Sequence, residues 1–122
     1  MSKTLTIQEF IASFESTDHY GRRVSKPRIF CKDGWSISIQ ADEYMAATKE
    51  GDEWITVELG FPSRFDKLIK PYAEPKLDRT DTYTNSVYNH VPIEVVEKLV
   101  VKHGGIVGTI LRGCEREVWK RK

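Results

Sequence analysis

The sequence predicts an α+β fold in which two to three helices pack on an antiparallel β-sheet. Residues 35–41 alternate apolar and polar side chains, which is typical of a half-buried strand. Asp33-Gly34, directly before them, is a dipeptide favoured in tight hairpins, where the backbone needs positive φ. Residues 6–16 and 92–103 instead repeat apolar side chains at the spacing of one helical face. Strands joined by a hairpin and flanked by amphipathic helices give this fold class.

The N-terminal part of the chain is predicted to hold a helix, a linker and the hairpin. In the helix over 6–16, Thr6 and Glu9 have the spacing of a capping box. Residues 17–27 form the linker, and strands at 28–31 and 35–41 form the hairpin. The second strand points four side chains inward: Trp35, Ile37, Ile39 and Ala41. Its opposite face carries Ser36, Ser38 and Gln40.

The middle of the chain is predicted to alternate strands with short connections. Residues 41–48 form a short helix or an irregular crossing, and Glu50-Gly51-Asp52 forms a turn. A strand over 54–61 places Ile55, Val57 and Leu59 on one face. Ser63 then caps a short helix that buries Phe65, Leu68 and Ile69, and Pro71 stops it. Residues 71–82 form a loop and 83–91 a strand.

The second clear helix spans 92–103 and ends at Gly104, and a strand follows over 106–111. The whole chain, 1–122, is read as a single domain. Within it, 1–25 is the N-terminal helix and linker, 28–105 a core, and 106–122 a C-terminal strand and basic tail.

Composition excludes several classes of protein. Hydrophobic residues make up 39% and charged residues 30% of the 122, which is ordinary for a globular chain. No apolar run is long enough for a bilayer and no secretory signal is visible, so we expect a cytoplasmic protein. The net charge of +1 argues against DNA or RNA as a partner. The basic stretch Trp119-Lys120-Arg121-Lys122 is mainly read as a solvated tail, with an arm for nucleic acid as the minor reading.

No metal, cofactor or catalytic site is predicted. Cys31 lies in an apolar strand and is expected in the core, and the three histidines are scattered. Gly104, Gly105 and Gly108 follow a helix, whereas phosphate loops precede one, so a helix stop is the favoured reading. Arginines are candidate phosphate ligands, because guanidinium binds phosphate oxygens in a fork. The most interesting are Arg28, at the entrance of the hairpin, and Arg112, at the end of an apolar strand.

Four strings, in this order, resemble a family of small proteins from phages and prophages of Gram-positive bacteria. They are Cys31-Lys32-Asp33-Gly34-Trp35-Ser36-Ile37-Ser38-Ile39-Gln40-Ala41, Val57-Glu58-Leu59-Gly60-Phe61-Pro62-Ser63, Tyr72-Ala73-Glu74, and Val91-Pro92-Ile93-Glu94-Val95-Val96 running to Lys102-His103-Gly104-Gly105. The match covers about residues 28–105 and is specific as a set. The chain departs from the family at Tyr88-Asn89-His90, where a Tyr-Gly-Tyr stretch is expected, and at Ala46-Ala47-Thr48-Lys49, where relatives often carry Ser-Pro-Arg.

The family that the chain resembles is the first type of Thoeris anti-defence protein. The resemblance implies a homo-oligomeric sponge with ligand pockets between protomers. Such a sponge sequesters a cyclic ADP-ribose isomer, made by a host TIR-domain enzyme, without cleaving it. We therefore expect a binding protein and not an enzyme. A protein-interaction inhibitor of a host defence enzyme is the alternative, and a small hydrolase of the signal ranks last for lack of a nucleophile and base.

The expected ligand-binding residues combine charge, backbone amides and flat side chains. Arg28 and Arg112 are expected at phosphate, and Gly104 and Gly105 supply backbone contacts. Base or ribose contacts are expected from Tyr88, Asn89 and His103. The departures from the family pattern mean that its pocket residues cannot be transferred cleanly.

Overall fold

The computed structural model describes residues 6–13, 20, 22, 26–42, 45–75, 83–110 and 116–118. The helices are α1 (Ile7–Ser13), the 3₁₀ helix η1 (Lys67–Tyr72) and α2 (Ile93–Lys102). The strands are β1 (Arg28–Cys31), β2 (Ser36–Gln40), β3 (Thr48–Glu50), β4 (Glu53–Gly60), β5 (Val87–Pro92), β6 (Ile106–Ile110) and β7 (Arg116–Val118). The predicted α+β class is confirmed.

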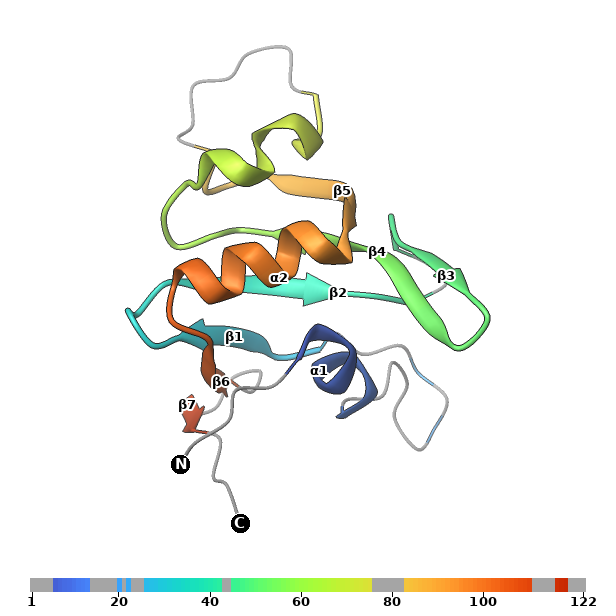
Figure 1. Ribbon diagram of the computed structural model, residues 1–122, viewed down its shortest axis with the longest axis horizontal. Helices are drawn as coiled ribbons and strands as arrows, with labels where there is room; N and C mark the ends of the chain where they lie inside the picture. The colour runs from blue at the N-terminus through green and yellow to red at the C-terminus, as the bar shows by residue number, and fades with distance from the viewer. Residues whose placement is uncertain are drawn as a thin grey trace.

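All seven strands form one antiparallel sheet (Figure 1). Its order is β3-β4-β2-β1-β6-β7. Strand β5 lies off this path and pairs with the second half of β4, from Thr56 to Gly60. Strand β3 and the first half of β4 extend beyond the rest of the sheet as a two-stranded arm (Figure 1). The sheet therefore places segments from both halves of the chain side by side, with β1 paired to β6.

The hairpin between β1 and β2 turns at Asp33-Gly34, as predicted. Gly34 has a φ of 92°, which a residue with a side chain rarely adopts. The Cys31 amide donates to the Trp35 carbonyl at 2.8 Å, and the Trp35 amide donates to Asp33 Oδ1 at 2.9 Å. These two hydrogen bonds hold the turn in place, and the position of the turn sets the register in which β2 pairs with β1.

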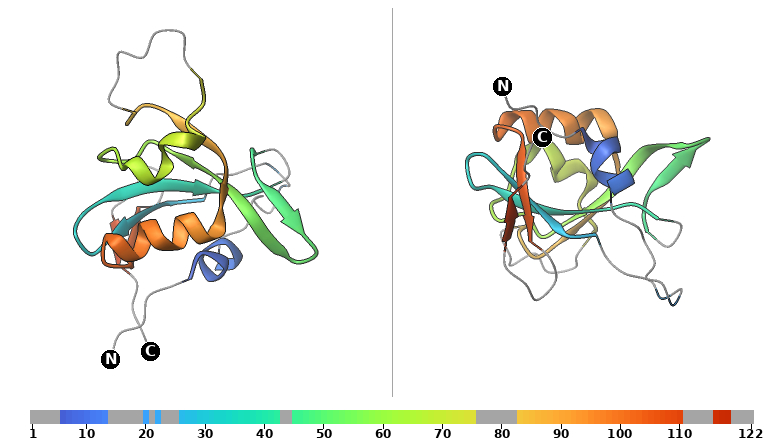
Figure 2. Two further views of the ribbon diagram at one scale, coloured as in Figure 1. Left: turned by 45° about the horizontal axis from the view of Figure 1, so that its top comes forward. Right: turned by 90° about the horizontal axis from the view of Figure 1, so that it is seen from below.

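Helices α1 and α2 lie on the same side of the sheet (Figure 2, right). The capping box of α1 is confirmed: the Thr6 amide donates to Glu9 Oε1 at 2.9 Å and the Glu9 amide donates to Thr6 Oγ1 at 3.1 Å. The Ile7 amide donates to Glu97 Oε1, which joins α1 to α2. The predicted helix continued to 16, and residues 14–16 lie outside the described residues.

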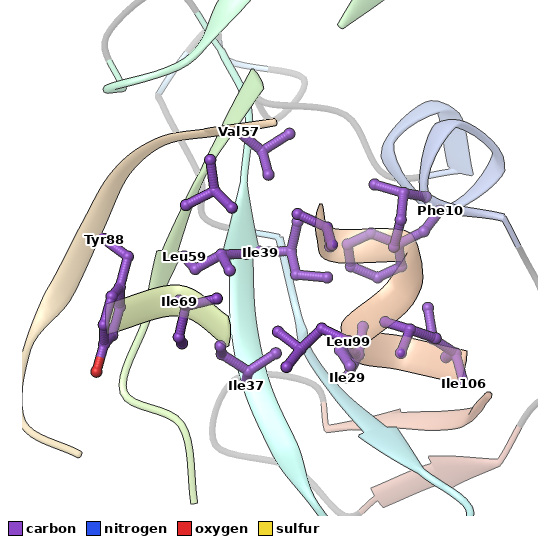
Figure 3. Close-up of a cluster of buried hydrophobic side chains, with 14 of the residues drawn as sticks. Phe10, Ile29, Ile37, Ile39, Val57, Leu59, Ile69, Tyr88, Leu99 and Ile106 are labelled. Atoms are coloured by element: carbon purple, nitrogen blue, oxygen red, sulfur yellow. The ribbon is translucent and has the colours of Figure 1, made fainter. Parts of the chain in front are cut away.

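The core lies between these helices and the sheet (Figure 3). Its fully buried side chains include Phe10, Ile29, Ile37, Ile39, Val57, Leu59, Ile69, Val96 and Leu99. The apolar face predicted for residues 35–41 is confirmed, because Trp35, Ile37, Ile39 and Ala41 are all buried; Ser36, on the opposite face, is buried as well. Cys31 is also buried, as expected. Each Ile or Leu buried in this way contributes roughly 1.5–3 kcal/mol of transfer free energy.

The short helix after Pro62 differs from the prediction. Asp66, not Ser63, caps it, and Pro71 lies inside its last turn. Because a 3₁₀ helix has three residues per turn, residues 66, 69 and 72 share one face, and 65, 68 and 71 share a different one. The first face is buried or half-buried, so Ile69 packs in the core as predicted, whereas Phe65 and Leu68 are 36% and 38% exposed.

Two further predictions on the middle of the sheet are wrong in part. Thr48–Glu50, placed in a crossing and a turn, is strand β3, paired with β4 around a turn at Gly51. Ile55 is 41% exposed, because it lies on the part of β4 that extends into the arm, while Val57 and Leu59 are buried. Strand β5 begins at Val87, later than predicted.

No helix in the described part of the chain is both long and apolar enough to cross a lipid bilayer.

Candidate functional site

The structure distributes the expected ligand-binding residues over three places. Arg28 lies on β1, Tyr88 and Asn89 lie on β5, and residues 103–105 follow the end of α2. Arg112 lies outside the described residues. The described ones among the expected residues therefore do not come together in one place, and the most informative polar contacts are those of Arg28 and His103.

Arg28 is a half-buried cation held by neutral groups. Its Nε donates to Ser36 Oγ at 2.9 Å, and its Nη2 donates to the Ser36 carbonyl at 3.2 Å and the Phe61 carbonyl at 2.5 Å. The two N–H groups of Nη1 have no acceptor among the described residues, and no described carboxylate contacts the side chain. Desolvation lowers the pKa of this guanidinium from its ordinary value. An anionic oxygen placed on Nη1 would accept from one of these donors and balance the charge of the guanidinium.

The polar row on β2 is mostly bonded within the chain. Gln40 Nε2 donates to Ser38 Oγ and to the Lys26 carbonyl, and Gln40 Oε1 accepts from the Lys26 amide. Ser36 is buried, and its hydroxyl accepts from Arg28. The row therefore orients Arg28 and joins the linker to the sheet.

On β5, Tyr88 and Asn89 have different surroundings. Tyr88 is fully buried and donates its hydroxyl to the Tyr83 carbonyl, so it lies in the core and away from the surface. Asn89 is half-buried on the neighbouring position. His90 follows with a φ of 49°, and its Nδ1 lies 3.1 Å from Thr48 Oγ1 and 3.3 Å from Thr56 Oγ1.

His103 lies between two carboxylates at the end of α2. Its Nδ1 is 2.6 Å from Asp33 Oδ2 and its Nε2 is 3.1 Å from Asp66 Oδ2. The ring stacks on Trp35 with centroids 4.3 Å apart and planes 6° apart. Both nitrogens donate at once only in the imidazolium form. We call Asp33, Asp66 and His103 the carboxylate–imidazole cluster.

Hydrogen bonds lower the pKa of both carboxyl groups in this cluster. For Asp33 the largest cause is the hydrogen bond with His103, followed by the one from the Trp35 amide. For Asp66 burial raises the pKa, but hydrogen bonds from the Leu68 amide, Lys102 and His103 together outweigh it. The Asp66 side chain is 3% exposed, and Lys102 Nζ lies 2.9 Å from its Oδ2. The cluster therefore joins the hairpin, η1 and the end of α2 through side-chain hydrogen bonds.

The glycines after His103 end the helix and turn the chain. The Gly104 amide donates to the Val101 carbonyl at 3.0 Å and the Gly105 amide donates to the Val100 carbonyl at 2.9 Å. A Cβ at Gly104 would lie 2.7 Å from Lys32 Cβ. Since both amides already donate within the chain, their structural role is a helix stop with a close approach to the hairpin.

The residues that join Arg28 to the carboxylate–imidazole cluster were not predicted from the sequence. They lie in the segment 61–66. At its start the Phe61 carbonyl accepts from Arg28 Nη2, and at its end Asp66 contacts His103. Between them the Ser63 amide donates to the Ser36 carbonyl, and Trp35 Nε1 donates to the Arg64 carbonyl. Asp66, two residues before Leu68, has the spacing of a side-chain cap, and that spacing was the available signal.

Among the described residues, no group of three or more His, Cys, Asp and Glu side chains is arranged to hold a metal ion. No family model, curated protein or solved structure matches the chain.

Proposed function

We propose that this protein binds and sequesters a cyclic nucleotide immune signal, a cyclic ADP-ribose isomer, without cleaving it. The resemblance of residues 28–105 to the Thoeris anti-defence family gives the ligand class. The observation that carries the proposal is the Arg28 guanidinium, which is half-buried and whose two Nη1 donors have no acceptor among the described residues.

An unpaired cation at this position has a free-energy cost that an anion relieves. Partial burial removes water from the guanidinium, and three neutral acceptors compensate only some of its donors. A phosphate oxygen on Nη1 adds a charge-assisted hydrogen bond, which contributes about 1.5–3 kcal/mol. A diphosphate is therefore a chemically fitting partner for this site.

Two features support binding without turnover. Burial raises the pKa of the Cys31 thiol to about 12, with a further contribution from Asp33, so this thiol is a poor nucleophile. His103 has both ring nitrogens on carboxylates, which leaves no nitrogen to take a proton from substrate or water. In the proposal the ligand leaves the protein chemically unchanged.

Titration calorimetry with cyclic ADP-ribose isomers tests the proposal. We expect binding by the wild type, a loss of about tenfold or more for Arg28→Gln, and no change for Lys49→Gln, which removes one exposed positive charge from the arm. Circular dichroism checks that Arg28→Gln is folded. Heat should release a ligand of unchanged mass. Absence of binding to the wild type, or release of a cleaved product, would overturn the proposal.

One observation favours the alternative of a protein-interaction inhibitor. Phe65 and Leu68 are exposed on η1 and its approach, next to Arg64 and Lys67. Exposed apolar side chains of this kind occur at protein interfaces. Pull-down from host lysate separates the two functions, since a sponge recovers nucleotide and an inhibitor recovers one host protein in stoichiometric amount.

A further inference from the structure

Phe61 adopts a backbone conformation that is unfavourable for its side chain. Its φ is 54°, in the left-handed region that glycine adopts readily and bulky residues avoid. Its amide donates to the Ser86 carbonyl at 3.0 Å, and its carbonyl accepts from Arg28 Nη2 at 2.5 Å. These two hydrogen bonds hold the peptide in place against the strain.

The side chain gives little stability in return. Phe61 is 46% exposed, so its ring gains only part of the transfer free energy that a core phenylalanine gains. A glycine at this position would keep both backbone hydrogen bonds and remove the strain. Strained backbone that folding does not require is characteristic of functional positions.

The ring belongs to the residue whose carbonyl accepts from Arg28 Nη2, so the backbone that carries it is a direct neighbour of the guanidinium. The site thus offers two different groups to a ligand: an exposed aromatic ring and the two unpaired N–H groups of Nη1. Aromatic rings bind nucleobases by stacking, and guanidinium binds phosphate. A nucleotide carries both of the matching groups.

We propose that Phe61 is the specificity-determining residue of this site: its ring stacks on the nucleobase while Arg28 Nη1 binds a phosphate oxygen. The inference rests on the proposed function and adds the residue that selects a nucleotide over other phosphorylated compounds. Stacking on one aromatic side chain strengthens binding about tenfold to a hundredfold.

The test compares Phe61→Gly with Phe61→Trp and with Phe65→Leu, a control for an exposed aromatic ring in the same segment. Phe61→Gly should unfold at the same temperature as the wild type or higher, yet bind cyclic ADP-ribose about tenfold to a hundredfold more weakly. Phe61→Trp should retain the affinity, and Phe65→Leu should not change it. If Phe61→Gly is more stable than the wild type and yet binds more weakly, Phe61 contacts the ligand and is not needed for folding.

A second ligand pair separates this inference from the proposed function. AMP and ribose 5-phosphate share a phosphate and differ by the base, and NMR titration measures both. The wild type should prefer AMP about tenfold or more, and Phe61→Gly should lose that preference. If the preference holds but no cyclic ADP-ribose isomer binds, only the proposed function fails. If Phe61→Gly binds every nucleotide as the wild type does, or if no nucleotide binds the wild type, the role of Phe61 is overturned.

Discussion

Replacing Asp66 by asparagine should remove most of the stabilisation that the carboxylate–imidazole cluster provides. The Asp66→Asn side chain keeps an oxygen for the Leu68 amide but removes the negative charge that faces His103 Nε2 and Lys102 Nζ. A hydrogen bond to a charged group contributes about 1.5–3 kcal/mol, and the half-exposed Lys102 adds about 0–1 kcal/mol. The expected loss in the free energy of unfolding is therefore about 1.5–4 kcal/mol at pH 7.

Urea unfolding followed by tryptophan fluorescence measures this loss. In a chain of this length that loss corresponds to a fall of about 6–16 °C in the melting temperature. Glu50→Gln, at an exposed position on the arm, removes the same charge and should change the free energy of unfolding by less than about 0.5 kcal/mol.

The difference between wild type and Asp66→Asn should also depend on pH. The native-state pKa of Asp66 lies below its ordinary value of 3.8, so the ionised carboxylate favours the folded state. Its contribution is complete above the ordinary value and disappears as the pH falls through the lowered native value. We expect the difference to be present at about pH 5 and to shrink below about pH 4. A loss no greater than that of Glu50→Gln, or one that persists undiminished at about pH 2, would refute the reasoning.

Three further predictions concern the helix stop, the buried thiol and β5. Gly104→Ala should destabilise the protein in thermal melts by about 2–3 kcal/mol, because its Cβ would collide with the hairpin as well as strain the backbone. Gly51→Ala, with a φ of 61° and open space around it, should lose only about 1 kcal/mol. Equal losses in the two variants would contradict the close approach of Gly104 to the hairpin. In a Cys114→Ser background, Cys31 should react with a thiol reagent only in denaturant, because the thiol is buried and its pKa is raised to about 12. Rapid labelling of the native protein would contradict the burial of Cys31. Tyr88→Phe should cost about 1 kcal/mol in urea unfolding and leave ligand affinity unchanged in calorimetry; weaker binding at unchanged stability would restore Tyr88 as a ligand contact.

The parts of the fold that could be predicted from sequence are those with a local cause. The hairpin follows from Asp33-Gly34 and the alternation after it, and α2 follows from its apolar spacing and Gly104. Strand β3 has only exposed side chains, so no alternation marks it, and its pairing with β4 defines it. The short helix η1 was predicted with the wrong buried face, because a period of 3.6 groups Phe65 and Leu68 with Ile69, whereas a period of three separates them from it.

The candidate site could be predicted only in part. The sequence singles out Arg28 and His103 as polar groups near turns, but their partners come from distant segments. His103 meets Asp33 and Asp66 only after the sheet and α2 have formed. The left-handed φ of Phe61 has no sequence signal either, because it results from the bonds to Ser86 and Arg28.

The position of β1 in the sheet has a consequence for synthesis on the ribosome. One edge of β1 pairs with β2 through a tight local turn, while the other pairs Arg28 with Ile110. The hairpin is therefore able to form as soon as it emerges, but the second edge of β1 stays open until residues 106–110 have been made. An open strand edge on a nascent chain is a template for pairing with other chains. Slow translation between β2 and β6 should for this reason lower the yield of native protein, and faster translation or a chaperone that covers the edge should restore it.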